Sequence, residues 1–177
     1  MKHTFVVFVE DKPGVLNRVV SVIRRRLFNV ASLSVGQTHQ NGVSRITMVV
    51  DSDKKEIERI IPYLYKLVNV LYVEDITQKP LVSRDLVMIK VRAEPETRAQ
   101  LMTLSEIYRA RVVDVANQSL IFEVTGDEEK VNRFVDNLRP YGIIEMARTG
   151  TVAMERGTDL HLEQPVRMQP AAVSAGL

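Results

Sequence analysis

The sequence predicts an α+β protein built from two ferredoxin-like βαββαβ modules, each an antiparallel sheet with its helices on one face. Strand-like and helix-like runs follow one another in the order β-α-β-β-α-β, and this order occurs twice along the chain. Residues 51–64 also align by eye with residues 125–138, as expected of an internal repeat. A Pro-containing stretch, 78–84, separates the two copies and is the predicted linker.

The first module is predicted over residues 1–77. Apolar residues at three- and four-residue steps from Val15 predict a helix, and Asn29 suits the left-handed conformation that often ends one. An Asn-Gly pair ending at Gly42 predicts a tight hairpin. Asp53 is expected to cap the second helix. The predicted strands are 5–9, 30–38, 43–50 and 70–76.

The second module is predicted over residues 85–157 and repeats the same order of elements. Its predicted strands are 86–91, 112–115, 120–125 and 143–147, and its predicted helices are 96–108 and 128–138. The remaining tail, 158–177, is rich in Pro, Ala, Met and Gln. We expect this tail to be disordered, because it has no periodic apolar pattern with which to build a core.

Composition narrows the classes of function. The chain has 177 residues, 45% of them hydrophobic, and a net charge of +2. So balanced a charge gives no large field for a nucleic acid or a membrane surface. The chain lacks cysteine, which fits a reducing cytoplasm, and it has no signal peptide pattern or apolar run of roughly 20 residues. We therefore expect a cytoplasmic protein that binds neither nucleic acid nor membrane.

The sequence offers no candidate catalytic or metal-binding constellation. The glycines do not form a nucleotide-binding loop, and His3, His39 and His161 lack metal-ligand spacing. RNA-recognition domains share this order of strands and helices, but they stack bases on aromatic residues of the third strand. The matching strand here, 43–50, contains no aromatic residue.

The turn between the first strand and the first helix is the one feature that suggests a ligand. Its sequence, Asp-Lys-Pro-Gly-Val-Leu from Asp11 to Leu16, puts a flexible Gly14 just before a helix start. Free N–H groups there suit the carboxylate of a small zwitterion. From the residues alone, a plain turn with Pro13 near the first helical position is the simpler interpretation.

Several longer motifs are typical of one protein family. The run from Val9 to Leu16, followed by a helix that ends in Phe-Asn-Val at 28–30, resembles the signature of ACT domains. The segments 28–38, 44–47, 84–91, 106–109 and 144–150 resemble, more narrowly, the small regulatory subunit of acetohydroxyacid (acetolactate) synthase. This resemblance covers roughly residues 3–157 and both repeats.

The resemblance implies a non-catalytic chain with an N-terminal ACT domain and a C-terminal ACT-like domain. In that family a separate catalytic large subunit uses thiamine diphosphate, Mg and FAD to join two 2-oxo acids. The small subunit carries no cofactor, raises this activity, and confers feedback inhibition by valine or another branched-chain amino acid. Its ACT domains are expected to pair side by side as a homodimer.

The resemblance also implies an effector site shared between two chains. One chain would contribute Asp11, Gly14, Val15 and Leu16, and its partner would contribute Asn29 and Val30. Backbone N–H groups from Gly14 to Leu16 would hold the carboxylate of the effector, and the three apolar residues would line its side chain. Related sensors often have Asn where Asp11 stands, and a carboxylate can only accept hydrogen bonds at neutral pH. The Asp11 carboxylate would therefore favour the ammonium group of the effector.

The second repeat departs from this pattern. Its matching loop, 93–98, lacks the Pro-Gly pair and adds two carboxylates. We therefore expect it to bind no amino acid and to serve in dimerisation or in contact with the catalytic subunit. The alternative function is a free-standing ACT sensor that acts on a transcription factor or a transporter.

Overall fold

The computed structural model describes residues 1–52 and 54–157. Asp53, the predicted helix cap, and the tail 158–177, predicted to be disordered, lie outside the described residues. The helix expected after this cap is present and begins at Lys54.

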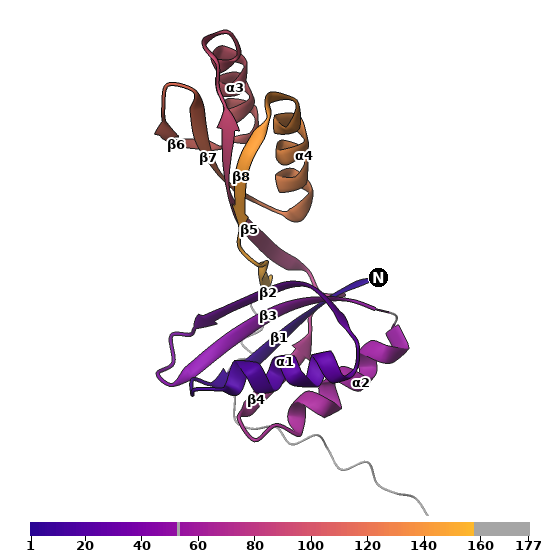
Figure 1. Ribbon diagram of the computed structural model, residues 1–177. Helices are drawn as coiled ribbons and strands as arrows, with labels where there is room; N and C mark the ends of the chain where they lie inside the picture. Colours follow the sequence, from indigo (N-terminus) through magenta and orange to yellow (C-terminus); the bar gives the residue numbers. More distant parts are fainter. Residues whose placement is uncertain (53, 158–177) are drawn as a thin grey trace, which may run out of the picture. The chain divides into compact units, whose positions relative to one another are not determined.

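The chain forms two compact units (Figure 1). Among the described residues, the first contains Met1–Leu81 and Met154–Gly157, and the second contains Val82–Ala153. The second unit is therefore inserted, in sequence, between two parts of the first. Within residues 1–52 and 54–157, no helix has the length and apolar character needed to cross a bilayer.

The first module has an antiparallel four-stranded sheet with the order β2-β3-β1-β4. Figure 1 shows its two helices on one face of this sheet. Its strands are β1 (Lys2–Glu10), β2 (Asn29–Gln37), β3 (Val43–Asp51) and β4 (Val70–Asp75), and its helices are α1 (Val15–Arg25) and α2 (Lys54–Tyr65). The predicted order of elements is confirmed in this module.

The core of the first module lies between the sheet and the helices. Along β1, Phe5, Val7 and Val9 enter this core, while Val6 and Phe8 lie on the opposite face because side chains of a strand alternate. α1 contributes Val15, Val19 and Ile23, which recur every four residues and so lie on one side of the helix. The apolar residues that recur with the helical period and those that recur with the strand period thus pack into one core.

The second module repeats this architecture, with the strand order β6-β7-β5-β8 and an additional short strand, β9, paired with β5. Its helices pack on one face of the sheet and share a core that includes Phe122 and Phe134. Its strands are β5 (Leu81–Arg92), β6 (Arg111–Val115), β7 (Ser119–Gly126), β8 (Ile143–Arg148) and β9 (Val152–Glu155), and its helices are α3 (Pro95–Tyr108), α4 (Glu128–Leu138) and the short η1 (Arg139–Tyr141).

Some local details differ from the predictions. The left-handed residue after α1 is Leu27, with φ = 59°, and Asn29 is already the first residue of β2. Strand β5 begins at Leu81, inside the segment expected to be a linker. The strand β9 was not predicted, because its four residues are too few to show a two-residue period.

Candidate functional site

The loop before α1 is open at Gly14. This residue has φ = 82° and precedes the helix as its N-cap, so Pro13 lies in the turn just before the helix. A side chain placed at Gly14 would meet no atom within 4 Å. The first helical hydrogen bond runs from Arg18 N–H to the Gly14 carbonyl at 3.1 Å. The N–H groups of Leu16 and Asn17 lie ahead of this bond and point out of the helix end, where an anion is favoured.

Asp11 lies beside this opening and is held in place by two neighbours. Its backbone N–H donates to the Gly42 carbonyl at 2.8 Å. Its carboxylate accepts a hydrogen bond from Gln37 Nε2 at 3.0 Å. A small cavity of about 80 Å³ adjoins these residues, well below the roughly 300–1,000 Å³ of typical ligand pockets. The cavity beside Asp11 in one chain is therefore too small to enclose a typical small-molecule ligand.

Asn29 and Val30 lie at the other end of α1. The helix has 11 residues and rises about 1.5 Å per residue, so it separates them from Gly14 by roughly 16 Å. Both are exposed, at the start of the edge strand β2. The structure of one chain thus does not bring the six predicted residues together; it places them at two ends of the same surface helix.

The two apolar residues at the start of α1 have different surroundings. Leu16 is 41% exposed, whereas Val15 is 4% exposed and belongs to the core. The expectation that the Val15 side chain lines an effector pocket is therefore wrong, because that side chain packs under the sheet. Its backbone remains part of the loop.

A polar network that sequence reasoning missed supports the loop from below. Asn69, before β4, donates to the Glu10 carboxylate at 2.5 Å and accepts from Arg18 Nη1 at 2.9 Å. Lys12 pairs with the same carboxylate at 3.0 Å. The two contacts of Asn69 join residues more than fifty positions apart, so no local pattern in the sequence predicts them.

The corresponding loop of the second module is closed. The same number of residues separates Ala93 from Arg109 as separates Asp11 from Leu27, but here α3 already begins at Pro95. Arg98 Nη2 donates to the carbonyls of Ala93, Ala116 and Asn117 at 3.2, 2.9 and 2.9 Å. The guanidinium thus ties the start of this loop to the turn between β6 and β7.

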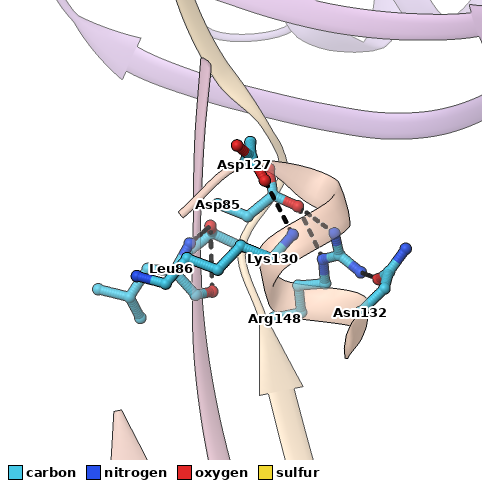
Figure 2. A network of polar contacts seen from close by, with 7 residues as sticks. Asp85, Leu86, Asp127, Lys130, Asn132 and Arg148 are labelled. Atoms are coloured by element: carbon cyan, nitrogen blue, oxygen red, sulfur yellow. Dashed lines mark hydrogen bonds and ion pairs between the residues drawn. The ribbon is translucent and has the colours of Figure 1, made fainter. Parts of the chain in front are cut away.

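Two of the motifs behind the family resemblance meet in a buried ion pair (Figure 2). Arg148, on β8, donates through Nε to the Asp85 carboxylate at 2.8 Å and through a second nitrogen to the same oxygen. It also donates to Asn132 Oδ1 at 2.8 Å. The Asp85 side chain is only 3% exposed. These motif residues therefore hold β5, β8 and α4 together.

No metal-binding cluster of three or more His, Cys, Asp or Glu residues lies within residues 1–52 and 54–157. Of the predicted site, the structure leaves the helix start at Gly14 and the strand start at Asn29 exposed.

Comparisons with known families match both modules. The model of the acetohydroxyacid synthase small subunit-like ACT domain matches residues 5–72, and the model of the small subunit of acetolactate synthase matches residues 84–157. The probable acetolactate synthase small subunit of Archaeoglobus fulgidus is 52% identical over 157 residues, which cover 89% of this chain and 98% of that protein. The small subunit of Bacillus subtilis is 42% identical over 159 residues, covering 89% and 92%.

A solved structure agrees with this match. The crystal structure of the acetolactate synthase small subunit from Thermotoga maritima superposes with a TM-score of 0.83 at 37% identity, covering 89% of this chain and 99% of that one. The likeness therefore extends over both modules at once, in sequence and in backbone. On this basis the chain belongs to the family of acetolactate synthase small subunits.

Proposed function

We propose that this chain activates a thiamine-diphosphate-dependent catalytic subunit of acetolactate synthase and makes it sensitive to valine or another branched-chain amino acid. In this proposal the chain itself carries no cofactor; thiamine diphosphate, Mg and FAD belong to the catalytic subunit. The product leads toward valine, leucine and isoleucine. The observation that carries the proposal is the open, left-handed Gly14 in front of exposed helix N–H groups.

The effector site is proposed to form between two copies of the chain. Asp11, Gly14 and Leu16 of one copy would face Asn29 and Val30 of the other, with the backbone of Val15 beside them. The position of β2 supports this arrangement, because β2 is the outermost strand in the sheet order and an edge strand can pair with a second β2. Leu16 and Val30, 41% and 36% exposed, offer apolar surface for a branched side chain.

The charges of the site suggest how the effector is oriented. The helix N–H groups at Leu16 and Asn17 suit its carboxylate, and the Asp11 carboxylate suits its ammonium. The Gln37 amide fixes Asp11 in this position. Binding can regulate the enzyme only if it favours one arrangement of the dimer over another, and a site that spans two chains provides such a difference.

The test is acetolactate formation by the catalytic subunit, with and without this chain, across a valine titration. We expect activation by the chain and loss of that activation as valine is added. Gly14→Ala and Asn29→Ala should keep the activation but weaken the response to valine by tenfold or more, about 1.4 kcal/mol of effector binding.

Gly142→Ala is the matched control. Gly142 also has a positive φ, 89°, but lies in the second module, so the substitution tests whether backbone strain away from the site changes the response to valine. If the chain neither bound nor activated the catalytic subunit, the proposal would be wrong. Activation without any response to valine would keep the subunit role and would direct the search to another effector.

A further inference from the structure

The proposed effector site does not use a cavity of about 450 Å³ in the first unit. Its floor is the face of the sheet that carries no helices, with Val6 and Phe8 of β1 in the middle. Its opposite wall is the segment Met154–Gly157, by which the chain returns to this unit. The volume falls within the range of roughly 300–1,000 Å³ that small-molecule sites occupy.

The floor is apolar and aromatic in its centre. Phe8 pairs across the sheet with Tyr72, and their ring centroids lie 6.2 Å apart. Ile76 and Met154 add further apolar surface. Burial, followed by the neighbouring Glu74, raises the pKa of Tyr72, so its hydroxyl keeps its proton and can donate. A flat or branched apolar body would find matching surface here.

Positive charge prevails on the walls. Arg45 pairs with Phe8 across the sheet, its guanidinium lies 5.9 Å from that ring, and it donates to Thr47 at 3.1 Å. Arg156 lines the opposite wall. The two carboxylates of the cavity, Glu74 and Glu155, are both bound by Lys79 Nζ at 2.6 and 2.7 Å.

This arrangement leaves the lysine and the two carboxylates largely occupied with one another. The hydrogen bonds to Glu155 and Glu74 raise the pKa of Lys79, so this cluster stays intact at neutral pH. Three basic side chains, Arg45, Lys79 and Arg156, thus line the cavity beside its two carboxylates, and the net charge of these five groups is positive. An anion is favoured, and a neutral or cationic ligand of the same shape gains less.

We propose that this cavity binds an organic anion with an aromatic or branched apolar body, at a site separate from the loop at Gly14. Binding would hold the returning segment Met154–Gly157 against the sheet, because a ligand between them touches both. Gln37 lines the cavity and also holds the Asp11 carboxylate at 3.0 Å. A bound anion could therefore alter the response to valine; that consequence rests on the proposed function, whereas the binding itself does not.

The first probe is the fluorescent anion 8-anilinonaphthalene-1-sulfonate, titrated into the full chain without the catalytic subunit. Its neutral analogue, N-phenyl-1-naphthylamine, has nearly the same apolar body and serves as the matched ligand. We expect saturable binding of one sulfonate dye per chain, and at least tenfold weaker binding of the neutral dye.

Variants locate the site. Arg45→Gln and, independently, the exposed Arg156→Gln should each weaken binding of the sulfonate dye by about tenfold, the effect of one lost charge-assisted hydrogen bond. Arg133→Gln, an exposed arginine of α4 in the second module, is the control and should leave binding unchanged. Thermal unfolding of each variant shows whether it is folded, and Arg156→Gln keeps the test open if Arg45→Gln unfolds.

Three outcomes would overturn the proposal. The neutral dye could bind as tightly as the anion, both arginine variants could bind the dye like the unchanged chain, or saturating valine could displace the dye completely. The last result would place the dye in the effector site. Acetolactate assays are not part of this test, so its failure and the failure of the proposed function remain distinguishable.

Discussion

The two modules repeat each other even in the irregularities of their strands. The edge strands β2 and β6 each carry a bulge at their third residue, Ala31 and Val113. The strands β4 and β8 each carry one at their second residue, Leu71 and Ile144. A bulge adds one residue to a strand, so the side chains beyond it point to the opposite face of the sheet. Two modules with the same alternation of buried and exposed residues must therefore have the bulge at the same position.

The helix ends also correspond. Leu27 after α1 and Arg109 after α3 both adopt the left-handed conformation, with φ of 59° and 52°. The backbone N–H of each donates a hydrogen bond to a carbonyl of the preceding helical turn. The backbone conformation at this junction therefore follows from the fold and not from the residue type, since leucine and arginine both pay a cost there.

The modules differ in their loops. Gly14 keeps the first loop open, whereas its counterpart Glu96 belongs to the first turn of α3. Leu16 is exposed in the first module, and its counterpart Arg98 binds three carbonyls in the second. The first loop is therefore open and the second is filled, although the order of strands and helices is the same in both modules.

The modules also differ in the polar pair that joins the outer strand to the first strand. In the second module Arg148 binds Asp85 at 2.8 Å. At the equivalent positions of the first module, His3 lies 3.5 Å from Asp75, with the acidic and basic partners exchanged. The His3 side chain is 6% exposed and that of Asp75 is 29% exposed, so the first pair is weaker and better hydrated on its acidic side.

The largest expected effect concerns whether the two modules unfold independently of each other. Phe134→Ala removes a fully buried ring that contacts Phe122 and Tyr108 and should cost about 3–5 kcal/mol. We expect hydrogen exchange to rise across the second module while β1 and β3 stay protected. Phe5→Ala, at an equally buried position, should give the reverse pattern. Loss of protection in both modules with either variant would mean that they unfold as one.

The exchanged polar pairs should differ in strength. Arg148→Met leaves the buried Asp85 carboxylate without its partner and should lower the free energy of unfolding by about 3–5 kcal/mol. Asp75→Asn should cost about 1 kcal/mol or less, because the acid is partly hydrated and the asparagine oxygen can still accept the hydrogen bonds from Thr77. Chemical denaturation measures both. Recovery of stability in the double variant Asp85→Leu, Arg148→Met would confirm that the unpaired charge causes the loss.

The filled loop can be partly opened. Arg98→Leu places in the second module the residue found at the matching position of the first, and should cost about 1–2 kcal/mol through the lost hydrogen bonds. We expect calorimetry to show no additional valine site, because Glu96 still closes the helix start. A second bound valine per chain, either in this variant or in the natural sequence, would show that Gly14 is not the deciding residue.

The smallest effect concerns the left-handed residues. Leu27 is 92% exposed, so Leu27→Gly loses little burial in the single chain and relieves a backbone cost of about 1–2 kcal/mol. The greater conformational entropy of glycine in the unfolded state offsets part of this stabilisation. We expect a net gain of about 0.5–1 kcal/mol in the free energy of unfolding. Arg109→Gly should behave alike. A lower melting temperature for Leu27→Gly alone would indicate that the leucine packs against a second copy.

Local patterns predicted the elements well where burial enforces a period. The strand 5–9 and the helix from Val15 were found because their apolar residues face one core. Two features carry no such period: the left-handed turn at Leu27, which the residue type disfavours, and the four-residue strand β9. Both follow from tertiary context.

Only those parts of the candidate site that a local motif marks could be predicted from the sequence. Gly14 and Leu16 stand out locally, and the structure leaves both exposed. Gln37 and Asn69 support the site through contacts between distant segments, which one sequence does not reveal. Val15 was misjudged because a residue on a helix start can face either the loop or the core, and only the packing of α1 decides.

The insertion of the second module between Leu81 and Met154 changes what a single break in the chain can release. A protease that cuts the exposed turn at Asn117 would produce two fragments, and each would carry a piece of the first unit. The piece beyond the cut retains Glu155 and Arg156, which bind Lys79 and the carbonyls of Pro80 and Leu81. The nicked protein should therefore migrate as one species in gel filtration and as two bands after denaturation.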